Sequence, residues 1–332
     1  MMDVIDSYIE YLRAIRRYSA RTVSIYEGVL MDYLAFVSAK EEVSSENDFI
    51  SSMNISEIRQ YEAAMLDGKE PKSAKTVGLH MSALSSFCRY LMQCGALKSN
   101  PVKLVTKPKV EKRLPQFFRK AAMANYFKQT DHILDKDEID GFLAGWQTKT
   151  GKQYYERLLE RLIISSFYSL GIRRAELIGL RIGDVDFGRN VVKVRGKGDK
   201  MREIPLVTSL SEEILLYLKA VETMCGRERS LKEPLFVTYK VTSLYPEYVE
   251  RAVKSALGDV KEIKGKKSPH VLRHSLATEL MNEETDLNSI KELLGHSSLA
   301  ATQVYTHSSI ARLKDSYERA HPRAKNGGKN GD

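Results

Sequence analysis

The sequence predicts a mainly α-helical protein of two domains, a helical-bundle N-terminal domain and an α-rich second domain with a small antiparallel β-hairpin. Three observations lead to this fold class. The chain has 332 residues, more than one hydrophobic core usually supports. Apolar residues recur at helical spacing over most of its length. Two short runs have strand character, and a glycine-containing turn separates them.

Residues 1–102 carry repeated helical patterns and are predicted to form the helical N-terminal domain. Ser19 and Ser73 each precede an apolar stripe, and both are expected to cap the helix that follows. The residues that are expected to face the core of this domain are Tyr8, Tyr11, Leu12 and Ile15, then Val23, Tyr26, Val29, Leu30, Tyr33 and Leu34, and later Val77, Met81, Leu84, Phe87, Cys88, Tyr90 and Leu91.

Residues 103–115 follow Asn100-Pro101 and are predicted to form a basic interdomain linker. The segment holds two prolines, and its five basic residues outnumber its one acid, Glu111. It could be a solvated connector or a strap along a phosphate backbone, and the sequence leaves both open.

The net charge is +9, because 52 Lys and Arg residues outnumber 43 Asp and Glu residues. This excess favours a polyanionic partner, although charge alone does not distinguish nucleic acid from anionic lipid. The three cysteines have no metal-type spacing, which favours reduced thiols and a cytoplasmic protein. We expect neither a secretion signal nor a membrane helix, since no sufficiently long apolar run occurs.

Residues 116–321 are predicted to form the second domain, and the polar tail at 322–332 is expected to be disordered. The strand-like runs at 190–195 and 201–206 flank a turn of five residues. Lys197 is expected at the tip of this hairpin, where a long basic side chain can extend into a neighbouring site.

Ser268-Pro269 is a strong helix start, and it places His270 and Arg273 on one face of the first turn. Both side chains and the helix N-terminus are therefore expected to face an anion. Each residue taken singly has a simpler interpretation, as a structural histidine or a surface charge. His274 gives the spacing of a zinc-binding helix, but no Glu stands between the histidines and Arg273 disfavours a cation, so we expect no metal.

Arg173 follows Gly171, which is expected to end a helix, and precedes Glu176 by about one turn. The Glu176 carboxylate could therefore fix the Arg173 guanidinium, and Arg174 is expected to be the more solvent-exposed arginine. Further on, Gly295 is expected to end another helix and to leave His296 on the connection that follows.

Tyr305 is expected about two turns into the next helix. A tyrosine on a helix is usually a core residue, so a chemical role needs a reason. A phenol with a pKa near 10 is only about a thousandth ionised at neutral pH and needs nearby cations or a proton acceptor to act as a nucleophile. Arg173, Arg273 and His270 could supply both, and Lys197 could protonate a leaving alkoxide. This set is suited to cleaving a phosphodiester without a metal.

The ordered set resembles the tyrosine recombinases, also called phage integrase-like proteins, and within them most closely the Xer proteins. The resemblance covers nearly the whole chain and includes Tyr18-Ser19-Ala20-Arg21-Thr22, Asn100-Pro101, Pro108-Lys109, Tyr305-Thr306-His307 and Ala320-His321-Pro322-Arg323-Ala324. It implies the tyrosine recombinase fold for the second domain. The stretch from Thr130 to Tyr155 is slightly long for a typical Xer protein, and the sequence indicates no role for it.

The resemblance implies that Arg173 and Arg273 bind the non-bridging phosphate oxygens and that His296 donates a hydrogen bond to the phosphate. It implies that Tyr305 attacks to give a 3′-phosphotyrosyl link. His270 would aid proton transfer.

By the same resemblance, Lys197 would protonate the leaving 5′ oxygen. The phosphotyrosine bond conserves the energy, so neither ATP nor a metal nor another cofactor is expected. The expected partner is double-stranded DNA with inverted-repeat half-sites, bound by a tetramer of this chain or of this chain and a second recombinase. A C-terminal exchange helix at 309–320 would dock on a neighbouring protomer, or instead cap its own domain.

The expected function is thus site-specific recombination through a Holliday junction, with chromosome dimer resolution favoured over an integrase or invertase of a mobile element. A DNA-binding relative without chemistry is the alternative from another class, and a type IB topoisomerase is disfavoured by the helical N-terminal domain. Formation of recombinants, and not merely relaxed plasmid, would separate a recombinase from these two. Gene neighbourhood and a nearby inverted repeat would separate an Xer protein from a mobile-element integrase.

Overall fold

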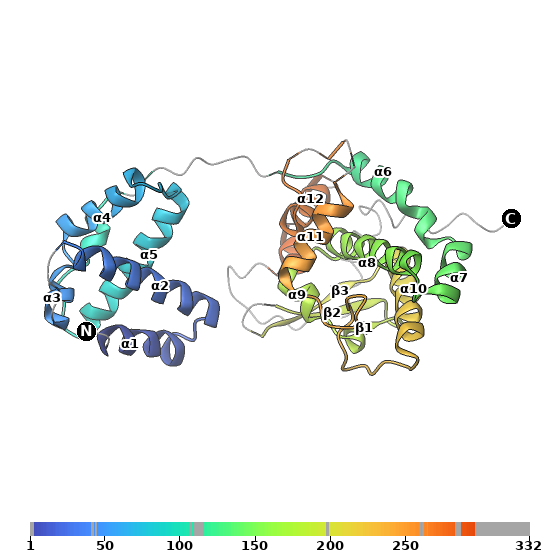
Figure 1. Cartoon of the computed structure of the whole chain (residues 1–332), viewed down its shortest axis with the longest axis horizontal. Helices are drawn as coiled ribbons and strands as arrows, with labels where there is room; N and C mark the ends of the chain where they lie inside the picture. Colours follow the sequence, from blue (N-terminus) through green and yellow to red (C-terminus); the bar gives the residue numbers. More distant parts are fainter. Residues whose placement is uncertain are drawn as a thin grey trace. The chain divides into compact units, whose positions relative to one another are not determined.

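The computed structural model describes residues 3–40, 43, 45–106, 108, 116–196, 199–258, 260, 262–263, 265–282 and 287–295. The chain divides into two compact units, residues 1–113 and 114–332 (Figure 1). Helices dominate both units, and a small sheet belongs to the second, as the sequence predicts. Most of the basic segment at 103–115 lies outside the described residues.

The N-terminal unit is all-helical in its described part. Its elements are α1 (Asp3–Glu10), the π-helical turn η1 (Tyr11–Ile15), α2 (Ala20–Ser38), α3 (Glu46–Ser51), α4 (Ile55–Asp67), α5 (Ala74–Gln93) and the 3-10 turn η2 (Pro101–Leu104). The predicted caps are confirmed, since Ser19 Oγ accepts from the Thr22 N–H at 3.2 Å and Ser73 Oγ from the Thr76 N–H at 3.1 Å.

The first apolar stripe is only partly buried. Tyr8 and Leu12 lie in the core, but Ile15 is 70% exposed, so its predicted core position is wrong. The reason is the π-helical turn that begins at Tyr11. A turn closed by i→i+5 hydrogen bonds holds more residues than an α-helical turn, so a spacing of three or four no longer keeps a side chain on the same face.

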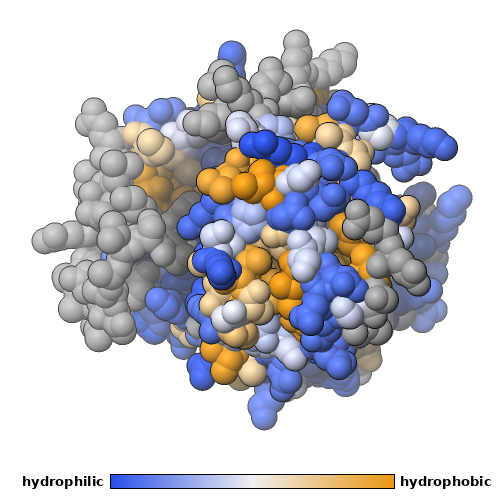
Figure 2. Space-filling model, turned by 90° about the vertical axis from the view of Figure 1, so that its left-hand side faces the viewer, coloured by the Kyte–Doolittle hydropathy of each residue, from blue (hydrophilic) through white to orange (hydrophobic). Residues whose placement is uncertain are grey.

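The core of this unit is aromatic and extends past α5. Tyr33 packs against Phe49 and Tyr61, with ring centroids 6.2 and 5.1 Å away. Val102 and Val105 also belong to this core, so the chain still packs on the first unit within the segment predicted as linker. On the face seen in Figure 2, hydrophobic residues lie between hydrophilic ones.

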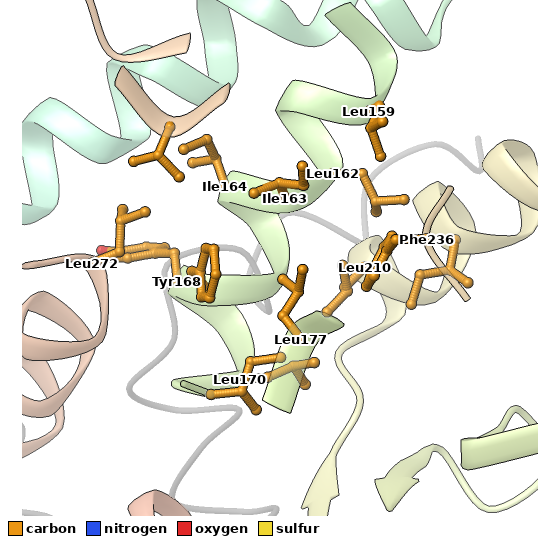
Figure 3. Packing of buried hydrophobic residues seen from close by; sticks show 14 of the residues in the cluster. Leu159, Leu162, Ile163, Ile164, Tyr168, Leu170, Leu177, Leu210, Phe236 and Leu272 are labelled. Atoms are coloured by element: carbon orange, nitrogen blue, oxygen red, sulfur yellow. The ribbon is translucent and has the colours of Figure 1, made fainter. Parts of the chain in front are cut away.

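The second unit is built around one long helix, α8 (Lys149–Leu170), against which α7 (Lys136–Gly145), α10 (Thr208–Cys225), α11 (Pro246–Ala256) and α12 (Pro269–Asn282) pack. Figure 3 shows residues of α8, among them Leu162 and Tyr168, within the apolar cluster that also holds Leu210 and Leu272. The other helical elements here are α6 (Lys120–Thr130), η3 (Asp131–Leu134), α9 (Arg174–Gly179), η4 (Ile182–Asp184) and α13 (Leu287–Leu294).

The stretch from Thr130 to Tyr155, whose role the sequence does not indicate, includes η3 and α7, which pack on α8, and the first residues of α8 itself. Tyr154 donates a hydrogen bond to the Ile133 carbonyl at 2.7 Å, and the buried Arg161 pairs with Asp131 at 2.7 Å. Gly151 lies against the preceding turn, where an added Cβ would be 2.4 Å from the Gly145 carbonyl oxygen. These contacts give the stretch a structural role.

In the described part of the chain, the sheet has three antiparallel strands in the order β1 (Val185–Asp186), β2 (Val191–Arg195) and β3 (Met201–Pro205). The predicted hairpin is therefore present, and Val194 pairs with Arg202 across it. Along β3, Arg202 and Ile204 are buried whereas Met201 is exposed, so the strand turns an arginine inward. Lys197 lies outside the described residues.

Among the helices of the described part, none is long and apolar enough to cross a membrane. The three cysteines, Cys88, Cys94 and Cys225, are unpaired thiols.

Candidate active site

Arg173 is placed by the end of α8. Gly171 ends this helix in the left-handed conformation, with φ of 59°, as the sequence predicts. Arg173 then precedes α9, and its backbone N–H and its Nη1 donate to the two oxygens of Glu176 at 2.8 and 2.7 Å. The predicted fixation of Arg173 by Glu176 is therefore confirmed. The Arg173 side chain stays 39% exposed, so it can meet a ligand.

Arg174 was expected to be the more solvent-exposed of the two arginines, and this prediction is wrong. Its side chain is 28% exposed and pairs with Glu250 of α11. The reason is tertiary, since α11 packs against α9 and brings the carboxylate to Arg174.

Arg273 lies in the first turns of α12, which begins at Pro269 as predicted. The residue is 6% exposed, and its guanidinium donates to the carbonyls of Gly171 and Leu294. Burial and the nearby Arg173 lower the pKa of Arg273 to about 10, so the group remains a cation at neutral pH. The interpretation of Arg273 as a surface charge is wrong.

The C-terminal end of α13 collects three guanidinium groups. Arg202 Nε donates to the Leu293 carbonyl at 2.9 Å, Arg273 donates to that of Leu294, and Arg173 Nη2 donates to that of Gly295 at 2.9 Å. The last carbonyls of a helix lack partners within the helix and form the negative end of its dipole, so cations are favoured there. The fold thereby brings Arg173 and Arg273 to one place.

Arg202 is a further residue of this site, in addition to those that the sequence predicts. Its Nη1 and Nη2 donate to the two oxygens of Glu176 at 3.1 and 2.8 Å, and its side chain is 6% exposed. Burial raises the pKa of Glu176, but the hydrogen bonds from Arg202 and Arg173 outweigh it and lower that pKa to about 2. The signal in the sequence was an arginine at an inward position of a predicted strand, in phase with Ile204.

His270 is exposed in the first turn of α12, and its ring lies 4.8 Å from that of His274, centroid to centroid. Partial burial and the neighbouring His274, Arg273 and Lys266 lower the pKa of His270, so its neutral form dominates at neutral pH. Among the described residues, the two histidines have no third metal-ligating side chain grouped with them.

Lys197, His296 and Tyr305 lie outside the described residues, so the structure tests none of their predicted positions. The residues just before two of them are described. An added Cβ on Gly196 would be 3.3 Å, and one on Gly295 3.1 Å, from Arg202 Nη1. The chain therefore passes the Arg202 guanidinium immediately before residue 197 and again immediately before residue 296.

In the part of the chain that is described, an all-helical unit precedes a helical unit in which Arg173, Arg202 and Arg273 gather at one helix end. Residues 5–95 match the phage integrase N-terminal SAM-like domain, and residues 132–312 match the phage integrase family. The chain belongs to the phage integrase family, whose members are the tyrosine recombinases.

Relatives in this family match over nearly their full length. A tyrosine recombinase XerC of Chlorobaculum parvum is 32% identical over 96% of this chain and 94% of its own. A tyrosine recombinase XerD of Listeria monocytogenes serovar 1/2a is 30% identical over 98% of this chain and 100% of its own. The resemblance to Xer proteins is thus confirmed.

Solved structures confirm the fold class. The XerH site-specific recombinase, in a post-cleavage complex with a palindromic difH substrate, matches with a TM-score of 0.64 at 20% identity, over 90% of this chain and 80% of that one. The Tn1549 transposon integrase, in complex with transposon right end DNA, matches with a TM-score of 0.62 at 18% identity, over 94% and 98%.

Proposed function

We propose that this protein is a site-specific DNA recombinase that cuts and rejoins DNA through a 3′-phosphotyrosyl intermediate and a Holliday junction. The observation that carries the proposal is the placement of Arg173 and Arg273 on adjacent carbonyls, directly before His296 in the chain. The similarity of this chain to XerC and XerD proteins favours an Xer-like role in chromosome dimer resolution over the alternative of an integrase or invertase of a mobile element.

In this mechanism Arg173 and Arg273 bind the non-bridging oxygens of the scissile phosphate. A guanidinium carries five N–H donors, and Arg173 and Arg273 each commit donors to protein carbonyls or to Glu176. Those bonds fix the planes of the two guanidinium groups before DNA binds. The remaining N–H groups meet the negative charge that grows on the phosphate in the transition state. His296 adds a hydrogen bond to the same phosphate.

Proton transfer is divided between His270 and Lys197. His270, whose pKa is lowered by partial burial and then by its neighbours, accepts the proton of the Tyr305 hydroxyl as the phenol oxygen attacks phosphorus. The bond to the 5′ oxygen breaks, and Lys197 gives that oxygen a proton. The reverse sequence, with a different 5′ hydroxyl, rejoins the strand.

The phosphotyrosyl bond keeps the energy of the cleaved phosphodiester, so the reaction uses neither ATP nor a metal. The arginines supply the positive charge that a metal ion would bring to other phosphate-cleaving sites.

The proposed partner is double-stranded DNA with inverted-repeat half-sites, bound in the cytoplasm by a homotetramer or a heterotetramer with a second recombinase. The proposed domains are residues 1–102 for core DNA binding, a basic linker at 103–115, and residues 116–321 for catalysis, which include the exchange helix at 309–320. The tail at 322–332 has no proposed role.

Substitution of the nucleophile tests the function. A nicked duplex that carries the binding site selected by wild-type protein from a random-sequence pool traps a covalent adduct, because the cleaved fragment diffuses away. Wild type should form the adduct on a denaturing gel, and Tyr305→Phe should bind the duplex with unchanged affinity but form none. Tyr245→Phe, at an exposed tyrosine of the same domain, is the matched control and should retain the adduct. Adduct formation by Tyr305→Phe would refute the assignment of the nucleophile.

A further inference from the structure

The Glu176 carboxylate is shared by two arginines from different elements. Its Oε1 accepts from Arg173 Nη1 at 2.7 Å and from Arg202 Nη1 at 3.1 Å. Its Oε2 accepts from the Arg173 backbone N–H and from Arg202 Nη2, both at 2.8 Å. A buried carboxylate with four such bonds has little freedom to move. The orientation of Arg173 therefore depends on Arg202.

Arg202 also holds the end of α13. Its third bond, from Nε to the Leu293 carbonyl at 2.9 Å, fixes the last turn before Gly295. Gly295 has φ of 62°, and an added Cβ there would be 3.1 Å from Arg202 Nη1. The guanidinium thus determines where the chain leaves α13 towards His296.

Arg202 stands on the hairpin strand β3, in register with Val194 of β2. Gly196 directly follows β2 and lies beside the same guanidinium. A Cβ added to Gly196 would be 3.3 Å from Arg202 Nη1. One buried side chain therefore hydrogen-bonds to Glu176, three residues after Arg173, and lies beside Gly196 and Gly295, which directly precede Lys197 and His296 in the chain.

We propose that Arg202 is a positioning residue of the recombination site, which sets the geometry of Arg173 through Glu176 and that of the end of α13 through the Leu293 carbonyl. This inference rests on the proposed recombinase function. Arg202 need not touch DNA, because its three hydrogen bonds all go to the protein and its side chain is 6% exposed.

The test compares Arg202→Met with Arg202→Lys and with a matched control, Arg229→Met. Arg229 is also a buried arginine that donates to backbone carbonyls, those of Pro234 and Leu235, and lies near a glutamate, Glu233. None of these partners belongs to the candidate site. Full-length variants are measured for affinity and for single-turnover adduct formation on the nicked duplex selected by wild-type protein.

Arg202→Met should bind the duplex like wild type and form the adduct roughly 10–100-fold more slowly, because a small misplacement of a reacting group can cost about 10²-fold. Arg202→Lys keeps the cation but cannot reproduce three directed bonds, so it should recover part of the rate. Arg229→Met should cleave at the wild-type rate. Equal losses in Arg202→Met and Arg229→Met would overturn the proposal, as would wild-type cleavage by Arg202→Met.

A double-mutant cycle separates positioning from general destabilisation. In an Arg173→Lys background, Arg202→Met should slow cleavage far less than in wild type, because both residues act through Glu176. If the two losses of cleavage rate multiply independently, the proposed coupling is rejected. If Arg202→Met does not fold, Arg202→Lys takes its place in the cycle. Failure of wild type itself to form any adduct would refute the recombinase function, whereas a wild-type adduct with undisturbed Arg202 variants refutes only this inference.

Discussion

Arg173 and Arg273 donate hydrogen bonds to adjacent backbone carbonyls, those of Gly295 and Leu294, at the C-terminal end of α13. One arginine precedes α9 and the other lies in α12, so neither helix alone could bring them together. The helix end stabilises two like charges side by side through its own negative pole. It is also the point from which the chain continues to His296.

We expect Arg173→Ala and Arg273→Ala to impair chemistry far more than binding. Adduct formation should fall by roughly 10²–10³-fold, the loss typical of a group that meets transition-state charge. DNA affinity should change little, since binding is spread over many phosphate contacts. Single-turnover cleavage and gel-shift titration of the same preparations measure both. Arg189→Ala removes an exposed arginine paired with Glu203 and is the control. Matching losses of affinity and cleavage would contradict the assignment.

Lys197→Ala tests the proton donor. Cleavage should slow by roughly 10²–10⁴-fold, the range for a positioned general acid. A substrate with sulfur in place of the bridging 5′ oxygen has a leaving group that needs no proton, so it should restore most of the rate. Lys193→Ala, on β2 of the same hairpin, is the control. If the variant is slowed equally on both substrates, Lys197 binds phosphate and does not donate a proton.

His274→Ala should change the pH dependence of cleavage. His274, Arg273 and Lys266 all lower the pKa of His270, in addition to the effect of burial. Removal of His274 lets that pKa rise, so His270 becomes protonated, and inactive as a base, at a higher pH. The acid limb of the cleavage rate should therefore move to higher pH, and Lys266→Ala should move it in the same direction. If the acid limb of the cleavage rate lies at the wild-type pH in both variants, His270 is excluded as the base.

Glu176→Gln should reduce the acid sensitivity of the fold. The pKa of Glu176 is lowered from 4.5 to about 2, so its ionised form stabilises the folded chain above pH 4.5, and this contribution is lost as the pH falls towards 2. The contribution is on the order of 3 kcal/mol for a shift of this size. Urea unfolding of the full chain at a series of pH values should show a shallower decline in the variant over this window.

Glu233→Gln is the control for that measurement. The pKa of Glu233 is also lowered to about 2, chiefly by the hydrogen bond from Arg227, but this ion pair is open to solvent. Solvent screening makes such a pair contribute little. Equal effects of the two substitutions would show that the buried network around Glu176 contributes no more to the stability of the fold than the exposed ion pair does.

Local patterns in the sequence predicted the helices and their caps. Ser19, Ser73, Gly171 and Pro269 mark helix ends because capping depends on hydrogen bonds and backbone angles within a few residues. The same locality explains the hairpin and the contact between Arg173 and Glu176. Ile15 was misplaced because a π-helical turn changes the period without a clear sequence signal.

The sequence by itself determined the family and the set of residues that we propose for the chemistry, because these depend on identity and order along the chain. Only the tertiary structure decided that Arg273 is buried, that Arg174 pairs with Glu250, and that Arg202 joins Glu176 to the end of α13. Each of these contacts links elements far apart in the chain, so it depends on how helices and strands pack. No local spacing encodes that packing, and only the packed fold turns three separate arginines toward one helix end.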